Sequence, residues 1–513
     1  MDDASRVFPP LPSDEELKTL YPSNMELLNV QILFRHGERT PVRARFQTWG
    51  LPPFWPFCKI ARQFTQTIVT YPNDATTPFE YVRRLESVAK DLPKNVPVPA
   101  SGFTPGQSDD LCMLGELTDL GRETGFTVGD RLRWLYINKL KFLPPLFTDH
   151  KYFYFRSSHV ARSNETLLSL FNGLYPPTFR KDGLKPTVYT RLFPQENAYP
   201  NDENCRRLSE LGFMFTEIVA NRWNPILADY PSSKLTDVLP NGVAIDGSPR
   251  ASGVFDTVAA CVAHNVPYPE GFKDERVVKE IRDAVMDEWY LGVQKSREYR
   301  TLAVGALAGD FLYRIKLAVN ADKASHGSKL KDLFATKEKF EPREKAVKLA
   351  LYGSHDTTIA SLLCAMEAFE HKWPPFTSEL KFELFGHSKP VEVPKPVDKP
   401  TVSTSESEVM NTPLRPAGFV SSKTKREYFV RLTYNDKILK LPGCAKEGDH
   451  LPGDSAFCTL DAFEKVINEF VPQNWELQCR QNLGKPVLDN AEIADEFSKI
   501  PRAEGALMAK PHA

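Results

Sequence analysis

The chain has 513 residues, of which 41% are hydrophobic and 26% are charged, a composition that is ordinary for a globular protein. Its 65 Lys and Arg residues almost balance its 66 Asp and Glu residues, for a net charge of −1. This balance argues against a nucleic-acid-binding protein, because such proteins carry a basic excess. No segment approaches about 18 uninterrupted apolar residues, so the sequence predicts no membrane span.

The first predicted element is a buried strand at residues 27–34, "LLNVQILF". It runs directly into Arg35-His36-Gly37-Glu38-Arg39. A helical pattern follows at residues 117–136, with glycine at positions 121, 125 and 129. Because glycine is costly inside a helix, this repeat predicts close packing of the helix against a sheet.

A second strand, residues 152–156, ends at Arg156 and leads into a helix that stops before Pro176-Pro177. Residues 178–330 then become mainly helical, which indicates an insertion between strands of the main sheet. A third buried strand, residues 346–353, leads into Ser354-His355-Asp356 and an apolar helix. Alternating strands and helices of this kind predict an α/β fold with parallel strands.

The sequence therefore predicts a three-part organisation. Residues 25–177 and 331–513 form the α/β core, and residues 178–330 form a mainly helical cap. Within the second part, residues 379–385 and 428–441 alternate as antiparallel strands do. Residues 386–426 between them are rich in Pro, Ser, Thr and Lys and predict a disordered insertion in a hairpin.

Polar residues at the three strand ends predict a ligand site. In α/β sheets, ligands bind outside the carboxyl ends of the strands. Arg35, Arg39 and Arg156 offer planar donor forks, which suit a tetrahedral phosphate better than a planar carboxylate. The sequence has neither a Walker-type phosphate loop nor a Cys/His cluster with zinc spacing. We therefore expect arginines, with no metal or other cofactor, to carry the charge of phosphoryl transfer.

The other polar residues at these ends have candidate roles in that transfer. A neutral His36 could attack phosphorus, His355 could donate a bond to a phosphoryl oxygen, and Asp356 could protonate the leaving group. Each has a structural alternative, since His36 could be a buried structural histidine and Asp356 an N-cap. His159 and Arg162 could line the pocket or be structural, and Arg43 and Arg45 are interpreted as surface or supporting charges.

These motifs resemble the histidine acid phosphatase family, the larger branch of the histidine phosphatases. "RHGERTP" matches the family signature, and "SHDTT", "FRSSHVARSNETLLSLFNGLYPP" and "GELTDLG" match three further elements. The resemblance implies a phosphoglycerate-mutase-like three-layer α/β sandwich with a central, mostly parallel sheet and a helical cap. It also implies that His36 is the nucleophile, Asp356 the proton donor, and Arg35, Arg39, Arg156 and His355 the phosphate ligands.

The resemblance extends to the cysteines, for which it implies the pairs Cys205–Cys479 and Cys444–Cys458. The family's partner for Cys261 is missing from "PPFTSEL". The acidic, Pro-rich N-terminus does not resemble a secretory signal. Together these observations slightly favour a cytoplasmic location, in which the cysteines could remain thiols.

The expected activity is hydrolysis of small phosphate monoesters, as in an acid phosphatase. A phytase-like enzyme and a lysophosphatidate or sugar-phosphate phosphatase are alternatives within the family. A catalytically degenerate phosphate-binding scaffold is the alternative from another class. The sequence does not indicate which oligomeric state the protein has.

Overall fold

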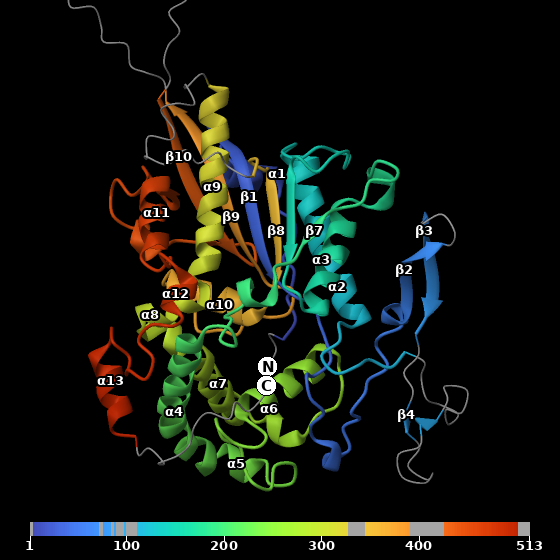
Figure 1. Ribbon diagram of the computed structural model, residues 1–513, viewed down its shortest axis with the longest axis vertical. Helices are drawn as coiled ribbons and strands as arrows, with labels where there is room; N and C mark the ends of the chain where they lie inside the picture. The colour runs from blue at the N-terminus through green and yellow to red at the C-terminus, as the bar shows by residue number, and fades with distance from the viewer. Residues whose placement is uncertain are drawn as a thin grey trace, which may run out of the picture.

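A computed structural model of the protein describes residues 4–70, 75–83, 87–88, 97–98, 110–326, 344–389 and 425–500. At its centre is one large sheet with the strand order β12-β13-β10-β9-β1-β8-β6-β7, and β11 pairs with β10 (Figure 1). The strands that pair in parallel are β1 (Met25–Arg35), β8 (Leu349–Ser354), β6 (Phe153–Ser157) and β7 (Val188–Tyr189). The antiparallel strands are β9 (Glu379–Lys389), β10 (Lys425–Tyr434), β11 (Lys437–Leu439), β12 (His450–Leu451) and β13 (Asp454–Thr459).

Helices cover both faces of this sheet. On one face, α2 (Asp119–Leu132) and α3 (Ala161–Leu174) pack on the side chains of Val30, Ile32 and Phe34. The other face carries α9 (Ala306–Ser325), α10 (Asp356–Ala365) and α11 (Leu460–Asn468). A parallel strand covered on both faces is a nearly continuous apolar run, which is what "LLNVQILF" is. The predicted three-layer α/β fold is confirmed.

A separate group of helices lies beyond the carboxyl ends of the parallel strands (Figure 1). Its members are α4 (Arg206–Asp229), α5 (Pro231–Lys234), α6 (Ala251–Ala263), α7 (Glu275–Lys295) and α8 (Arg297–Arg300). The range predicted for the cap also contains β7, which is part of the sheet, and α9, which packs on it. The Gln31 side chain donates to the carbonyl of Phe311 on α9 at 2.9 Å, so α9 is a layer of the core.

The glycines of α2 pack against a helix and a loop, whereas the sequence predicted that they would pack against a sheet. A Cβ added to Gly129 would lie 1.9 Å from the carbonyl oxygen of Leu170 on α3. A Cβ on Gly121 would lie 2.2 Å from the carbonyl oxygen of Glu38. Periodicity alone shows that a helix face approaches something closely, but it does not distinguish a helix backbone from a strand.

The β9–β10 hairpin extends further than the sequence predicted. Residues 386–389 continue β9 and residues 425–426 belong to β10, so these ends of the predicted insertion are ordered strand. Residues 390–424 lie outside the described residues.

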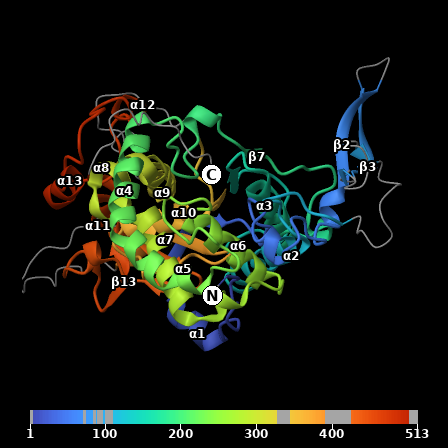
Figure 2. The ribbon, with the colours of Figure 1, turned by 90° about the horizontal axis from the view of Figure 1, so that it is seen from below.

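A second hairpin, which was not predicted, joins β2 (Gln63–Thr70) to β3 (Ala75–Val82). It projects away from the body of the protein (Figure 2). The strands β4 (Ser87–Val88) and β5 (Pro97–Val98) form a further small pair. The other α-helices of the described residues are α1 (Asp14–Leu20), α12 (Trp475–Gln478) and α13 (Ala491–Ser498). Within the described ranges, no helix is long and apolar enough to cross a membrane.

Three disulfides are present. Cys205–Cys479 and Cys444–Cys458 are the pairs that the family resemblance implied, and Cys58–Cys112 was not expected. Cys261 and Cys364 are free and buried. Since disulfides are rare in the cytosol, three of them argue against the cytoplasmic location that the sequence slightly favoured.

Candidate active site

The carboxyl ends of β1, β8 and β6 lie side by side. Arg35 is in register with Ser354, and Ser157 is in register with Gly353. Because the three strands are parallel neighbours, the residues that follow them reach the same edge of the sheet. The structure therefore brings together five of the predicted site residues: Arg35, His36, Arg39, His355 and Asp356.

His36 is buried and has a defined tautomer. Its Nδ1 lies 2.9 Å from the carbonyl oxygen of Gly37. A carbonyl can only accept, so Nδ1 carries the hydrogen and Nε2 keeps its lone pair. Burial, followed by the charges of Arg162 and Arg39, holds the pKa of His36 well below its usual value. The imidazole is therefore neutral even in mildly acidic solution.

His355 is the second neutral imidazole of the site. Its ring centroid lies 5.5 Å from that of His36, edge to face. Its Nε2 lies 3.1 Å from the hydroxyl oxygen of Ser158 and 3.5 Å from that of Ser163. Burial and the nearby Arg162 lower the pKa of His355 to about 3.

Asp356 begins α10, and its carboxylate is held on both oxygens. Oδ2 lies 2.8 Å from Nη2 of Arg35 and accepts a hydrogen bond from the Trp373 indole at 3.1 Å. Oδ1 accepts from the backbone N–H of Thr357 at 2.8 Å. Burial raises the pKa of Asp356, but Arg35, Arg39 and His355 outweigh it and hold that pKa below the usual value. Asp356 is not the N-cap of α10, which is His355, but the first helical residue, and its carboxylate lies in the site.

Arg39 connects the core to the cap. Its Nη2 lies 2.7 Å from Oδ1 of Asp256 on α6, and its Nη1 donates to the carbonyl of Thr40 at 3.1 Å. The second oxygen of Asp256 accepts from the backbone N–H of Val42 at 3.2 Å. Nothing in the sequence around Asp256 pointed to the site, because the contact depends on how the cap is placed over the core.

The structure does not place Arg156 where the sequence predicted it. Arg156 is 1% exposed and forms a buried ion pair with Glu196, and its Nη1 lies 3.4 Å from Oδ2 of Asp310 on α9. Side chains alternate between the two faces of a strand. Arg156 is on the face that packs against α9, and its guanidinium is already neutralised by two carboxylates.

Arg162, on the first turn of α3, lies among the site residues instead. Within the described residues its guanidinium makes no ion pair, and its buried Nε has no hydrogen-bond partner. Burial and the charge of Arg39 lower the pKa of Arg162 to about 10. After burial, its charge is the largest influence on the pKa of both His36 and His355. Of the two roles that the sequence left open for Arg162, the structure supports the pocket.

The remaining candidates lie at the rim or behind it. The exposed His159 contacts Phe193 and Tyr199 edge to face, at centroid distances of 5.3 and 5.8 Å. Tyr199 in turn contacts His355 at 5.6 Å. Arg45 packs against α6 at Gly253, with its Nη1 3.4 Å from the hydroxyl of Thr257.

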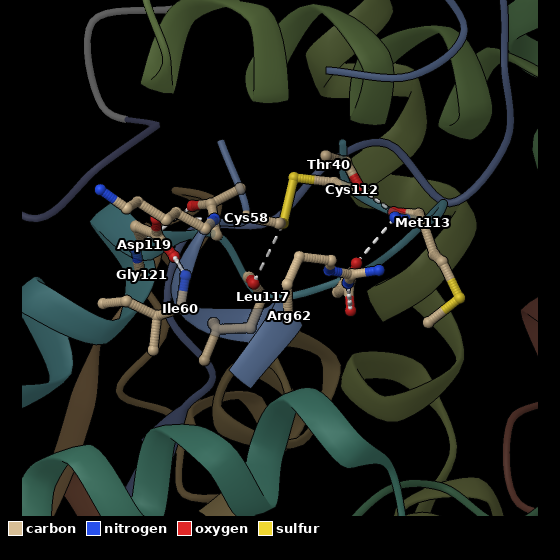
Figure 3. Close-up of a disulfide and its surroundings, with 12 residues drawn as sticks. Thr40, Cys58, Ile60, Arg62, Cys112, Met113, Leu117, Asp119 and Gly121 are labelled. Carbon is tan, nitrogen blue, oxygen red and sulfur yellow. Dashed lines mark hydrogen bonds and ion pairs between the residues drawn. A yellow bond between two sulfur atoms is a disulfide. The ribbon is translucent and has the colours of Figure 1, made fainter. Parts of the chain in front are cut away.

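The loop that carries His36 packs against the beginning of α2. A Cβ on Gly37 would lie 2.3 Å from the carbonyl oxygen of Gly121, so the loop and α2 are in backbone contact. The Cys58–Cys112 disulfide lies beside this support (Figure 3), with Sγ of Cys58 3.6 Å from the carbonyl oxygen of Leu117. Thr40 donates to the carbonyl of Met113 at 2.7 Å in the same view. The disulfide thus fixes the segment against which Arg39 and Thr40 are paired.

The described part of the chain holds no group of three His, Cys, Asp or Glu side chains placed to bind a metal ion. The guanidinium groups of Arg35, Arg39 and Arg162 act on His36, and the carboxylates Asp356 and Asp256 act on these arginines. Arg35, Arg39 and Arg162 each have a buried Nε with no hydrogen-bond partner among the described residues. Such an arrangement suits a small multivalent anion that accepts several hydrogen bonds.

The family model of the histidine phosphatase superfamily, branch 2, matches residues 26–435. The chain belongs to this family. A probable acid phosphatase of Schizosaccharomyces pombe is 32% identical over 490 residues, covering 94% of this chain and 98% of that protein. Lysophosphatidic acid phosphatase type 6 of Homo sapiens is 27% identical over 464 residues, covering 90% of this chain and 87% of that protein.

Among solved structures, a multiple inositol polyphosphate phosphatase of Bifidobacterium longum is similar at a TM-score of 0.49 and 10% identity, covering 91% of this chain and 97% of that one. The expected activity class is confirmed by the family and by its named relatives: this histidine phosphatase is a phosphoric monoester hydrolase of the acid phosphatase type.

Proposed function

We propose that the enzyme hydrolyses phosphate monoesters by transferring the phosphoryl group to Nε2 of His36 and then to water. The observation that carries this assignment is the hydrogen bond from Nδ1 of His36 to the carbonyl of Gly37 at 2.9 Å. It directs the lone pair of Nε2 away from the loop, and the depressed pKa keeps that lone pair free in acid. A neutral imidazole is a competent nucleophile toward phosphorus.

Three arginines, Arg35, Arg39 and Arg162, bind the phosphoryl group. This set keeps two members of the predicted cradle and replaces Arg156 by Arg162. Arg162 has no anionic partner of its own within the described residues, whereas Arg156 has two. A bound phosphate would supply the missing partner, and each charge-assisted hydrogen bond would contribute about 1.5–3 kcal/mol.

His355 assists by donating to a phosphoryl oxygen. If the hydroxyl of Ser158 donates to Nε2 of His355 across the observed 3.1 Å, the ring hydrogen must sit on Nδ1. Nδ1 has no hydrogen-bond partner within the described residues. A fixed N–H of this kind stabilises charge that develops in the transition state without having to reorient.

Asp356 protonates the leaving oxygen. In the free enzyme its carboxylate is ionised, because Arg35 lies 2.8 Å away. A phosphate dianion bound to the same arginines adds negative charge next to Asp356 and draws on their positive charge. Both effects raise the pKa of Asp356, so substrate binding itself favours the protonated acid.

A rapid-quench experiment with a ³²P-labelled aryl phosphate tests the intermediate. Wild type is expected to give about one acid-labile, base-stable phosphate per active site in a burst. His36→Ala is expected to give none and to lose at least about a thousandfold in kcat. His326→Ala, which removes an exposed histidine at the end of α9, is the control. Saturable binding of substrate by wild type without any labelling would instead support the phosphate-binding scaffold.

The substrate is proposed to be a monoester with an apolar group. A series of ring contacts leads outward from His355 through Tyr199 and His159 to Phe193, which is exposed, as is the adjacent Leu192. On the cap side, Asp256 adds a carboxylate next to Arg39, which disfavours substrates with several phosphates. We therefore expect kcat/KM to be higher for a lysophosphatidate than for a sugar phosphate, and lowest for phytate. The reverse order would favour the phytase-like alternative.

A further inference from the structure

Trp373 contacts the proposed acid directly. It lies in the loop between α10 and β9, and its indole Nε1 donates to Oδ2 of Asp356 at 3.1 Å. Arg35 approaches the same oxygen at 2.8 Å. Indole and guanidinium groups are donors only, so Oδ2 is held by two groups that cannot accept a hydrogen bond.

The indole is itself fixed by the cap. Its ring packs against Phe255 of α6 at 5.3 Å and against Tyr290 of α7 at 5.4 Å. The hydroxyl of Tyr290 is buried and has no partner among the described residues, so it does not compete for the indole N–H. The cap therefore positions Trp373, and Trp373 contacts the catalytic edge of the core.

The loop after Trp373 is tied to the site at several points. The carbonyl of Pro374 accepts from Nη1 of Arg35 at 2.5 Å, and the N–H of Thr377 donates to the carbonyl of His36 at 3.2 Å. Phe376 lies 4.0 Å from the guanidinium carbon of Arg35. On its outer side the loop is held by the N-terminal segment, since Phe376 donates to Ala4 at 2.9 Å.

We propose that Trp373 is a positioning residue that determines which oxygen of Asp356 carries the proton. With Oδ2 facing two donors, the acidic hydrogen must reside on Oδ1, whose one hydrogen bond within the described residues comes from the N–H of Thr357. In the transfer step, Nε2 of His36 bonds to phosphorus as the P–O ester bond breaks. The proton on Oδ1 passes to the departing oxygen, which leaves Asp356 as a carboxylate and the product as an alcohol. This inference rests on the proposed function.

Other charged and titratable groups also face Asp356. Arg35 ends β1 and Arg39 follows it, His355 follows β8, Arg162 is on α3, and Tyr290 is on α7. None of them changes when the indole is replaced by a phenyl ring. A shift in the pH profile of the variant can therefore be assigned to the lost hydrogen bond.

Trp373→Phe tests the proposal because it keeps the aromatic packing and removes the donor. Two substrates separate acid catalysis from binding: p-nitrophenyl phosphate, whose leaving group needs little protonation, and a monoalkyl phosphate, whose leaving group needs it fully. We expect kcat/KM to fall about tenfold for the alkyl ester and by less than about threefold for the aryl ester. The loss of activity at high pH should move upward by about one pH unit, because the carboxylate form of Asp356 loses a donor.

Trp223→Phe is the matched control. Its indole donates to Oδ2 of Asp287 at 2.8 Å between two cap helices, so the same kind of bond is removed away from the site. This variant should leave the ratio of alkyl to aryl turnover and the pH profile unchanged. An equal loss on both substrates in Trp373→Phe, with an unshifted pH profile, would overturn the proposal and leave Trp373 a packing role.

Benzothienylalanine at position 373 covers the case in which the phenyl variant folds poorly. It has the shape of tryptophan with sulfur in place of the N–H, and it should reproduce the selective loss on the alkyl ester. Labelling of His36 in the quench experiment keeps the two hypotheses apart. Labelled enzyme with an unchanged alkyl-to-aryl ratio refutes only the role of Trp373, whereas unlabelled wild type refutes the phosphohistidine mechanism itself.

Discussion

The end of β6 and the start of α3 each present an arginine, and the protein holds the two in opposite ways. Arg156 is enclosed by Glu196 and Asp310, and Glu196 also accepts from the backbone N–H groups of Asn197 at 2.9 Å and Ala198 at 2.8 Å. Arg162 lies among two histidines, two other arginines and the carboxylates Asp356 and Asp256, and it makes no ion pair within the described residues. One positive charge is neutralised by the protein, and the other is left for a ligand.

This difference shows what prepares an anion site. A buried charge that is already paired contributes to the fold, and breaking the pair leaves its partner uncompensated. A partly buried cation without a partner is unfavourable in the free protein and becomes favourable when an anion binds. Burial is the largest cause of the depressed pKa values of Arg162, His36 and His355, and the neighbouring guanidinium charges lower these values further.

Arg162→Ala is expected to have the largest effect on catalysis. Loss of a guanidinium that stabilises the transferring phosphoryl group should lower kcat/KM by about a thousandfold to ten-thousandfold. The free energy of unfolding should not fall, because no ion pair is lost. Steady-state kinetics with an aryl phosphate and urea unfolding measure the two effects. Arg180→Ala, at an arginine far from the site that donates to Asn172, is the control.

Arg156→Ala is expected to show the opposite pattern. The free energy of unfolding should fall by about 3 kcal/mol, because Glu196 stays buried without its cation. Turnover per folded molecule should change by less than about tenfold. Arg156→Met combined with Glu196→Gln removes both charges and should recover most of the stability. A large loss of kcat/KM in Arg156→Ala with unchanged stability would restore Arg156 to the phosphate site.

These two arginines also show how far the sequence could predict the site. The strand ends at Arg35 and at His355-Asp356 were predictable, because a parallel strand fixes where the next residue emerges and the motif fixes its type. The middle arginine was not, since "FRSSHVAR" contains two, and their spacing does not show that Arg156 on β6 turns toward α9 while Arg162 on α3 faces the site. Asp256 and Trp373 lay beyond prediction as well, because each reaches the site only through the packing of the cap or a loop.

The fold, like the site, was predictable from the sequence only in part. Apolar runs identified β1 and β8 and hence the layered α/β core. The cap limits at residues 178 and 330 were less accurate, because α9 has the helical pattern of the cap but packs on the sheet. Helical periodicity reports that a helix has a buried face and does not report which layer buries it.

The smallest expected effect is on the pH dependence of the free energy of unfolding. It again distinguishes Arg162 from Arg156. In the folded protein the pKa of His355 is about 3 and that of His36 is well below 6.5, whereas both return to about 6.5 on unfolding. Below pH 6.5 the unfolded chain therefore binds more protons, so stability falls as the pH is lowered toward the folded-state values.

Arg162→Ala removes a cation beside both rings and should make this fall shallower between pH 6.5 and 4. The double variant Arg156→Met with Glu196→Gln should leave this slope unchanged, because it removes a buried ion pair as a whole and takes no charge from beside the histidines. Urea midpoints at several pH values measure both slopes, and equal slopes in the two variants would contradict the placement of Arg162 beside the histidines.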